Sequence, residues 1–312
     1  MIDCRVVFFG TPAFSIAALE ALLADHWQVI AAVSQPDKEV GRKRVLQKTK
    51  LKEYAEAHDI PVLQPVRLKD SPSDILNLHP DLIVTCAYGQ LIPEVILKAP
   101  KYGCVNIHPS PLPKYRGGAP VQRAIMNGDP STEVCLMEMA KKMDSGRVYA
   151  RIPHAIGPDV TGTQLFEELK PDVRRLIHEY LPMYLEGKLP GEAQDDALAV
   201  LAPNIERDEE QLHFQSESLT VIYNHARGLI EDPMPYGLLE GKRIKFCRIA
   251  KKEGICEKEP GTVLGLSGRA LEIAADGGVL QVYELQPEGK QRMAASAWFN
   301  GAGRNTVGRQ FE

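Results

Sequence analysis

The sequence predicts an α/β domain followed by a smaller β domain, and three observations carry this prediction. Strand-like and helix-like segments alternate over about the first 150 residues, which favours a mostly parallel sheet with helices on both faces. Residues 81–87 form a near-continuous apolar run, as expected of a strand buried on both faces. From Arg207 on, short strand-like segments separated by turns predict a barrel or sandwich of about 100 residues.

Hydrophobic spacing predicts the elements in order. In the first domain we expect strands at 5–9, 29–34, 61–64, 81–87, 103–107, 134–140 and 147–156. We expect helices at 13–25, 49–58, 93–99, 118–127 and 163–185, with Pro171 as a point where the last can break. In the second domain a helix at 218–228 should precede strands at 241–250, 261–265, 270–274 and 278–285.

Composition narrows the class of protein. A length of 312 residues suggests two domains, and the 44% hydrophobic and 25% charged residues are typical of a globular chain. Lys and Arg number 37 against 41 Asp and Glu, so the net charge of −4 excludes a uniformly basic surface but not a local basic patch.

The expected location is the cytoplasm, with no membrane association. The chain has no apolar run near the ~18 residues that a membrane helix needs, and we expect no signal peptide. The six cysteines form no C-x-x-C pair, which predicts reduced, mostly buried thiols and no structural metal site.

Residues 106–120 carry the strongest catalytic signal. Asn106 and His108 lie two positions apart at the end of a predicted strand, so both side chains point to the same face. An Asn amide can donate to a carbonyl oxygen, and a His can exchange a proton near neutral pH. Alone, a His at a strand end is more often structural, but the proline-rich loop after it favours a preorganised site. Asp144 is either part of a simple turn or the carboxylate that orients His108.

Two loops should border this site. Residues 8–12 follow the first strand but contain one glycine, so a pyrophosphate could not approach as in a dinucleotide-binding turn. In the functional interpretation Thr11 and Phe14 border a pocket at the carboxyl edge of the sheet; otherwise the loop is only a tight turn. Residues 87–93 form either a plain strand-to-helix loop or a backbone wall for a flat heteroaromatic ring.

Two basic clusters are either solvated surface or contacts to an anion. Residues 38–52 carry seven basic residues and one acidic residue, a charge of +6. Residues 239–252 carry six basic residues and one acidic residue, a charge of +5. Two such clusters on an acidic chain favour a polyanion that spans both domains.

Short matching segments run along the chain: FFGTPAFS at 8–15, QPDK followed by GR at 35–42, IPVLQP at 60–65, AYGQLIP at 87–93, NIHPSPLPKYRGGAP at 106–120, DSG at 144–146, APNIER at 202–207 and LQPEGK at 285–290. With them the chain resembles the folate-dependent formyltransferases over nearly its whole length, and within them the enzymes that formylate methionyl-tRNA. The resemblance implies a Rossmann-like catalytic domain at 1–188, a linker at 189–206 and an OB-like, tRNA-binding β-barrel at 207–312.

The implied reaction moves the formyl group of 10-formyltetrahydrofolate to the α-amine of methionine on initiator tRNA, with no metal and in a monomer. Matching positions make Asn106, His108 and Asp144 the catalytic residues. The folate-binding positions are Tyr88, Gly89, Gln90, Leu91, Ile92, Ser110, Pro111, Leu112 and Pro113. The substrate and tRNA positions are Phe14, Gly41, Arg42, Lys43, Arg44, Lys242, Arg243 and Lys245. Pro111 within the folate segment and Pro109 just before it depart from the usual family pattern.

Three other functions compete with this one. A sugar-nucleotide N-formyltransferase would use the same folate donor and the same three catalytic residues, but it does not need two basic clusters. A catalytically silent RNA-binding protein would not need Asn106, His108 and Asp144. A nicotinamide dehydrogenase is disfavoured by the missing glycines after the first strand.

Overall fold

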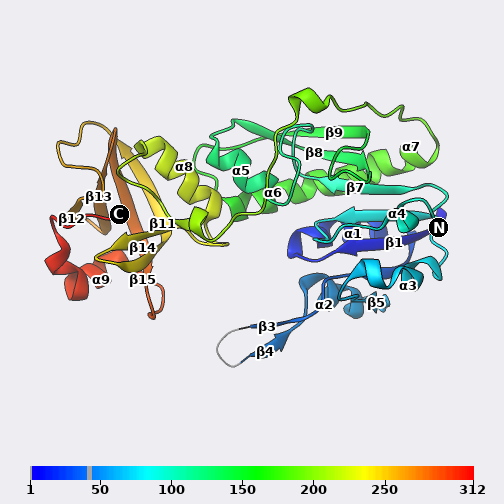
Figure 1. The fold of residues 1–312 in the computed structure, drawn as a ribbon, viewed down its shortest axis with the longest axis horizontal. Helices are drawn as coiled ribbons and strands as arrows, with labels where there is room; N and C mark the ends of the chain where they lie inside the picture. The colour runs from blue at the N-terminus through cyan, green and yellow to red at the C-terminus, as the bar shows by residue number, and fades with distance from the viewer. Residues whose placement is uncertain (1, 41–43) are drawn as a thin grey trace. The chain divides into compact units, whose positions relative to one another are not determined.

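The computed structural model describes residues 2–40 and 44–312, which form two compact units. The first unit comprises Met1–Pro120, Thr132–His154 and Phe166–Pro203, and the second comprises Val121–Ser131, Ala155–Leu165 and Asn204–Glu312. Of the expected linker at 189–206, residues 189–203 thus pack within the first unit, and residues 204–206 belong to the second. The expected order, an α/β domain followed by an antiparallel β domain, is confirmed (Figure 1).

The first unit is built on a seven-stranded sheet with the order β5-β2-β1-β6-β7-β8-β9 within the described residues. The strands are β1 Ile2–Gly10, β2 Trp27–Val33, β5 Val62–Leu63, β6 Leu82–Cys86, β7 Cys104–His108, β8 Ser131–Glu138 and β9 Val148–Ala155. Neighbours from β5 to β7 pair in parallel, and β8 runs antiparallel to β7. The sheet is therefore mostly parallel, as the sequence predicts.

Both faces of this sheet are buried, which explains its continuous apolar strands. Val6, Val7, Phe8 and Phe9 of β1 are all 0% exposed, although neighbouring side chains point to opposite faces. Val7 and Phe9 pack in a cluster that includes Ile75. Hydrophobic burial on both faces thus holds the central strand in place.

The helices follow the expected order, except that the sequence did not predict the helix at Pro72–Leu76 and that the irregular turn near Pro171 lies elsewhere. They are α1 Ala13–Ala24, α2 Lys50–Ala57, α3 Pro72–Leu76, α4 Glu94–Leu97, α5 Pro120–Met126, α6 Gly162–Arg175 and α7 Leu181–Leu185. Helix α6 continues through Pro171, and the irregular turn lies later, at Leu176–Tyr180, where the backbone forms a π-helical turn. The sequence did not predict the hairpin of β3 Lys38–Val40 and β4 Val45–Gln47.

The strand order changes direction beside the candidate catalytic residues. The chain moves from β1 outward to β2 and β5, and then returns to β6 on the other side of β1. In open α/β sheets ligands bind at the carboxyl edge near such a change of direction. The loops after β1 and β6 meet there, because Thr11 Oγ1 donates to the Tyr88 carbonyl at 2.9 Å.

The second unit contains an antiparallel sheet with the path β10-β11-β14-β13-β12. Its main elements are α8 Leu219–Leu229, β10 Tyr236–Leu239, β11 Lys242–Glu253, β12 Val263–Ser267, β13 Ala270–Ala275 and β14 Gly278–Pro287. Gln310 bridges to Thr262 and Phe311 bridges to Leu239, so this terminal segment links the two edges of the sheet. The buried Phe311 ring also packs against Phe246 at 5.5 Å between centroids. This linkage gives the sheet a barrel-like closure.

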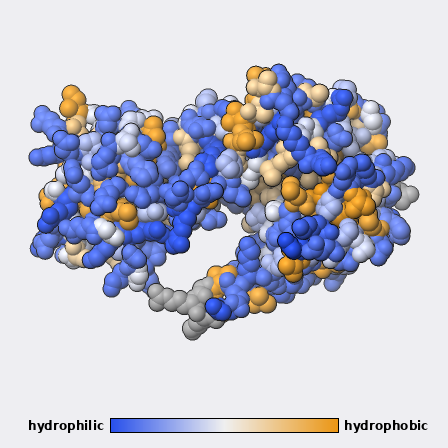
Figure 2. Space-filling model, viewed as in Figure 1, coloured by the Kyte–Doolittle hydropathy of each residue, from blue (hydrophilic) through white to orange (hydrophobic). Residues whose placement is uncertain are grey.

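The surface carries few large apolar groups in one place. On the face in Figure 2 hydrophilic residues dominate, and apolar residues form small separate patches. Among the helices of the described residues, none combines the length and apolar character required to cross a membrane.

Candidate active site

The predicted catalytic pair lies on β7, at the carboxyl edge of the sheet. Asn106 and His108 are separated by one residue and therefore share a face of the strand. His108 is 4% exposed, so its ring sits in a largely dehydrated environment. Hydrogen bonds and charges have greater energetic weight in such surroundings than in water.

The amide of Asn106 has a defined orientation. Thr85 lies opposite Asn106 in the parallel β6–β7 pairing, and its hydroxyl donates to Asn106 Oδ1 at 2.7 Å. Because Oδ1 already accepts this hydrogen bond, the Nδ2 amino group remains the donor that faces away from Thr85. The threonine therefore orients the Asn106 amide so that Nδ2 can donate a hydrogen bond to another acceptor.

Replacing Thr85 with valine tests this orientation. The change keeps the side-chain shape and removes the donor, so Asn106 can turn its oxygen toward the substrate. We expect kcat to fall about tenfold, corresponding to the loss of one hydrogen bond. Steady-state kinetics measure the effect. Thr132→Val is the matched control, because the buried Thr132 hydroxyl has no partner among the described residues; an equal loss in both variants would contradict the assignment.

The contacts of His108 determine which nitrogen of the neutral ring carries the hydrogen. Nε2 lies 3.0 Å from the carbonyl oxygen of Tyr115, which can only accept, so Nε2 carries a hydrogen. In the neutral ring the lone pair is then on Nδ1. Nδ1 lies 3.8 Å from Asp144 Oδ2, longer than a hydrogen bond but close enough for charge attraction.

Asp144 is held in place by backbone contacts. Its Oδ2 accepts a hydrogen bond from the Gly117 amide at 2.8 Å, and its own backbone adopts a left-handed conformation with φ 48°. Gly117 has φ +137°, and an added Cβ would collide with the carbonyl of Ala202. A glycine is therefore required at 117 for this backbone to pack against Ala202 while its amide binds Asp144. The conformation brings Asp144 to the same site as His108, although the two residues are far apart in sequence.

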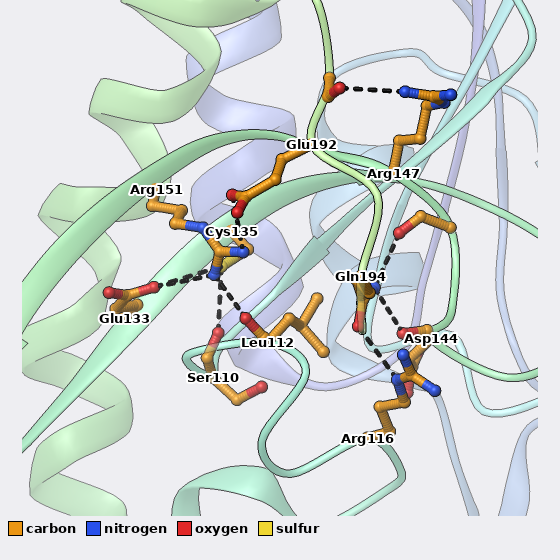
Figure 3. Close-up of polar contacts among 12 residues, drawn as sticks. Ser110, Leu112, Arg116, Glu133, Cys135, Asp144, Arg147, Arg151, Glu192 and Gln194 are labelled. Carbon is orange, nitrogen blue, oxygen red and sulfur yellow. Dashed lines mark hydrogen bonds and ion pairs between the residues drawn. The ribbon is translucent and has the colours of Figure 1, made fainter. Parts of the chain in front are cut away.

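The proline-rich loop after His108 is anchored by Arg151. Figure 3 shows the Arg151 guanidinium donating to the Leu112 carbonyl at 2.6 Å and to Glu133 Oε2 at 3.2 Å. Ser110 is fully buried, and its hydroxyl donates to the Lys114 carbonyl at 2.8 Å. These bonds keep residues 110–113 in a single shape.

The second predicted folate segment presents its backbone rather than its tyrosine ring. The Tyr88 side chain lies in the core, 5.0 Å from Phe9 between ring centroids, and burial raises the pKa of its hydroxyl to about 12. Its carbonyl accepts from Gln35 Nε2 at 3.1 Å. Gln90 is anchored by accepting from the Leu68 amide at 2.9 Å, whereas Leu91 is 70% exposed.

The remaining predicted contacts fall into three groups. Phe14 is 4% exposed and packs edge-on against Phe166, so its ring belongs to the core in this structure. Gly41, Arg42 and Lys43 lie outside the described residues. Arg44 is exposed near Glu39 at 3.8 Å.

Several lysines of the first basic cluster already have acidic partners. The Nζ atoms of Lys48, Lys50 and Lys52 lie within 2.8 Å of a carboxylate oxygen of Glu56, Glu53 and Asp37, respectively. In the second cluster the side chains of Lys242, Arg243 and Lys245 make no ion pair with any residue that the structure describes. These three side chains of the second cluster are therefore more available for an external anion, whereas Lys251 in the same cluster pairs with Glu253 at 2.6 Å.

The chemistry near the site does not involve a thiolate. Cys135 lies beside Ser110, its thiol donating to the Ser110 carbonyl at 3.1 Å. Burial raises the pKa of Cys135 to about 12, and burial does the same for Cys86. Both thiols stay protonated at neutral pH. No cluster of three metal-ligating side chains is found in residues 2–40 and 44–312.

Three residues that orient the site, Thr85, Arg151 and Gln194, were not predicted from the sequence. Thr85 is the polar residue within an otherwise apolar strand, which is a detectable signal. Arg151 and Gln194 act on backbone carbonyls of distant loops, and no local motif marks such contacts.

Two family models match nearly the whole chain. The formyl transferase model matches residues 4–181, and the formyl transferase C-terminal domain model matches residues 204–303. The chain therefore belongs to the formyl transferase family. Within it, the chain falls among the methionyl-tRNA formyltransferases: one from Lactiplantibacillus plantarum is 43% identical over 303 residues, 95% of each chain.

Solved structures share the fold at low identity. HypX from Aquifex aeolicus in complex with tetrahydrofolic acid aligns with a TM-score of 0.67 and 19% identity, over 97% of this chain and 48% of that chain. An N-formyltransferase from Helicobacter canadensis in complex with folinic acid and dTDP-3-aminofucose gives 0.68 and 16%, over 91% and 99%. At such identities these two likenesses support the fold.

Proposed function

We propose that this chain transfers the formyl group of 10-formyltetrahydrofolate to the α-amino group of the methionine on initiator tRNA. The observation that carries the proposal is its 43% identity to a methionyl-tRNA formyltransferase over 95% of both chains. The arrangement of Asn106, His108 and Asp144 supports it, because together they supply a donor, a proton carrier and a carboxylate at one edge. We expect the enzyme to act as a cytoplasmic monomer.

The residues around the site fit a folate. The segment 88–92 offers backbone N–H and C=O groups outside regular secondary structure, and hydrogen bonds from Gln35 and Gln90 hold this segment in place. Alternating donors and acceptors of this kind suit the edge of a pterin ring. Leu91 is 70% exposed and can cover an apolar ring face. We propose that this segment and the anchored residues 110–113 hold the folate.

The geometry supports a division of chemical roles. When bound, the folate supplies a formyl group on a nitrogen that can leave. Asn106 Nδ2 donates to the formyl oxygen as negative charge develops there. His108 Nδ1 takes the proton of the attacking amine and returns it to the departing nitrogen, while Nε2 stays bound to the Tyr115 carbonyl. Asp144 stabilises the protonated ring by charge attraction across 3.8 Å.

We propose that tRNA contacts two separate regions. In the first unit, the β3–β4 hairpin presents Val45 and Leu46, which are 61% and 66% exposed, beside Arg44. In the second unit, Arg243 and Lys245 line a pocket of about 380 Å³. Arg243 also lies 4.1 Å from the centroid of Tyr236, a cation–π contact that pre-positions its guanidinium.

Arg243→Ala should weaken tRNA binding in a salt-dependent manner. If Arg243 contacts a phosphate, its loss reduces the slope of log affinity against log salt by about one. A filter-binding or fluorescence titration over a salt series measures this slope. Arg309→Ala is the control, because Arg309 is paired with Glu240 at 3.3 Å in the same unit. An unchanged slope for Arg243→Ala would contradict the proposed contact.

The proposed function is tested by following the labelled formyl group. Formyl-labelled 10-formyltetrahydrofolate is incubated with the enzyme and with charged or uncharged initiator tRNA. We expect the label on the methionine nitrogen of the charged tRNA only. Label transfer to water alone, or equal reaction with uncharged tRNA, would contradict the proposal.

A further inference from the structure

The irregular segment 191–202, which we call the strap, lies against the loops that carry the candidate catalytic residues. The Arg116 amide donates to the Val200 carbonyl at 2.9 Å, and the Ala202 amide donates to the Arg116 carbonyl at 2.7 Å. The strap has almost no regular secondary structure, so its shape depends on these specific contacts.

Gln194 is the strap residue that reaches the Asp144 turn. Its Nε2 donates to the carbonyl of Asp144 at 2.9 Å and to the carbonyl of Gly146 at 2.7 Å (Figure 3). Its Oε1 accepts from Arg116 Nε at 3.0 Å. Carbonyls only accept and a guanidinium only donates, so the three contacts are compatible with one orientation of the amide.

Arg116 fixes Gln194 from the other side. The Arg116 side chain is 2% exposed, and Nη1 pairs with Asp196 Oδ1 at 2.7 Å. A buried guanidinium that is bound on two edges has little freedom to move. The chain of contacts therefore runs from Arg116 through Gln194 to the backbone of Asp144.

We propose that Gln194 is a positioning residue for Asp144. By holding the carbonyls of Asp144 and Gly146, it maintains the left-handed backbone at Asp144, where φ is 48°. This conformation directs the carboxylate to the Gly117 amide and to His108 Nδ1. The inference rests on the proposed catalytic role of Asp144, and assigns to the strap a function in the chemical step.

Gln194→Ala should lower kcat about 10- to 100-fold, since a displacement of about 1 Å in a catalytic group can cost that much. The KM values for the folate and for the charged tRNA should change less than about twofold, because Gln194 contacts neither substrate in this account. Gln194→Glu keeps the acceptor for Arg116 but loses both donors, and we expect a similar loss of kcat. Thermal unfolding of each variant reports whether the fold is retained.

A double-mutant cycle distinguishes a specific effect of Gln194 on Asp144 from a general loss of order in the strap. In an Asp144→Asn background, Gln194→Ala should reduce kcat by less than about twofold further, because the group it positions is already impaired. Arg147→Ala is the matched control: it removes a 3.1 Å hydrogen bond to the strap at Gly191 without touching the Asp144 carbonyl, and should leave kcat unchanged.

The possible outcomes distinguish the positioning role of Gln194 from the catalytic role of Asp144. Independent, multiplicative losses in the Asp144→Asn and Gln194→Ala variants would overturn the positioning role while leaving the catalytic role of Asp144 intact. An equal loss of kcat in Arg147→Ala would also overturn it, because any disturbance of the strap would then suffice. A wild-type kcat in Asp144→Asn would overturn the proposed role of Asp144, and the inference with it.

Discussion

Asn106→Ala is expected to reduce kcat about 10²–10³-fold, because it removes the hydrogen-bond donor aimed at the developing negative charge. The affinity for charged tRNA should remain within about twofold, since the lost bond matters mainly in the transition state. Rapid-quench measurement of formyl transfer, together with a separate binding titration, gives both quantities.

A second substitution at the same position excludes a packing defect as the cause. Asn106→Asp keeps the size and shape of the side chain but places an acceptor, and a negative charge, where Nδ2 donates. We expect a loss of kcat at least as large as that of Asn106→Ala. Near-normal turnover in either variant would show that Asn106 does not stabilise the transition state.

His108→Gln is expected to reduce kcat about 10²–10⁴-fold, the range for loss of a general acid–base. A Gln amide can still donate to the Tyr115 carbonyl, as Nε2 does at 3.0 Å, and so preserves the loop. It cannot take up a proton at the position of Nδ1. Steady-state kinetics with saturating folate and charged tRNA measure the loss.

This variant also distinguishes a catalytic histidine from a structural one. His108 is 4% exposed and bound to a backbone carbonyl, which is equally typical of a histidine that only supports a loop. His108→Ala removes both functions, whereas His108→Gln removes proton exchange alone. If His108→Gln turns over normally while His108→Ala does not, the role of His108 is structural.

Hydrophobic runs and the alternation of side chains along a strand were sufficient to predict β6 and the shared orientation of Asn106 and His108. The apolar run at 81–87 contains β6 Leu82–Cys86, because burial on both faces favours apolar side chains at nearly every position. Asn106 and His108 share one face because side chains alternate along any strand. These conclusions need no knowledge of the tertiary structure.

Contacts between residues that are distant in sequence could not be predicted from the sequence, for a physical reason. Thr85 meets Asn106 through the register of β6 against β7, and an apolar sequence does not specify that register. Gln194 acts on backbone carbonyls 48 and 50 positions away, and a backbone carbonyl is the same whatever residue carries it. The sequence of the strap therefore predicts a linker, because the strap is ordered by these contacts and not by a periodic pattern of hydrophobic residues.

At Pro171 and at the β3–β4 hairpin, the secondary structure differs from what local sequence preferences predict. Helix α6 continues through Pro171, where the neighbouring Leu169 and Val173 are fully buried, and the irregular turn appears later, at Leu176–Tyr180. The basic segment 38–52 has no strand-like alternation, yet residues 38–40 and 45–47 pair as β3 and β4. Charge alone suggested a binding surface there, but three of its lysines are paired within the unit.

The most direct test of the central claim is a competition between acceptors. Enzyme and 10-formyltetrahydrofolate are mixed with equal concentrations of charged initiator methionyl-tRNA and an amino-sugar nucleotide, and the formylated products are quantified. The account predicts formyl-methionine on the tRNA as the dominant product, with a yield that falls steeply as salt rises. Predominant formylation of the amino sugar, with little dependence on salt, would retain the fold and the Asn106–His108–Asp144 site but contradict the assigned substrate.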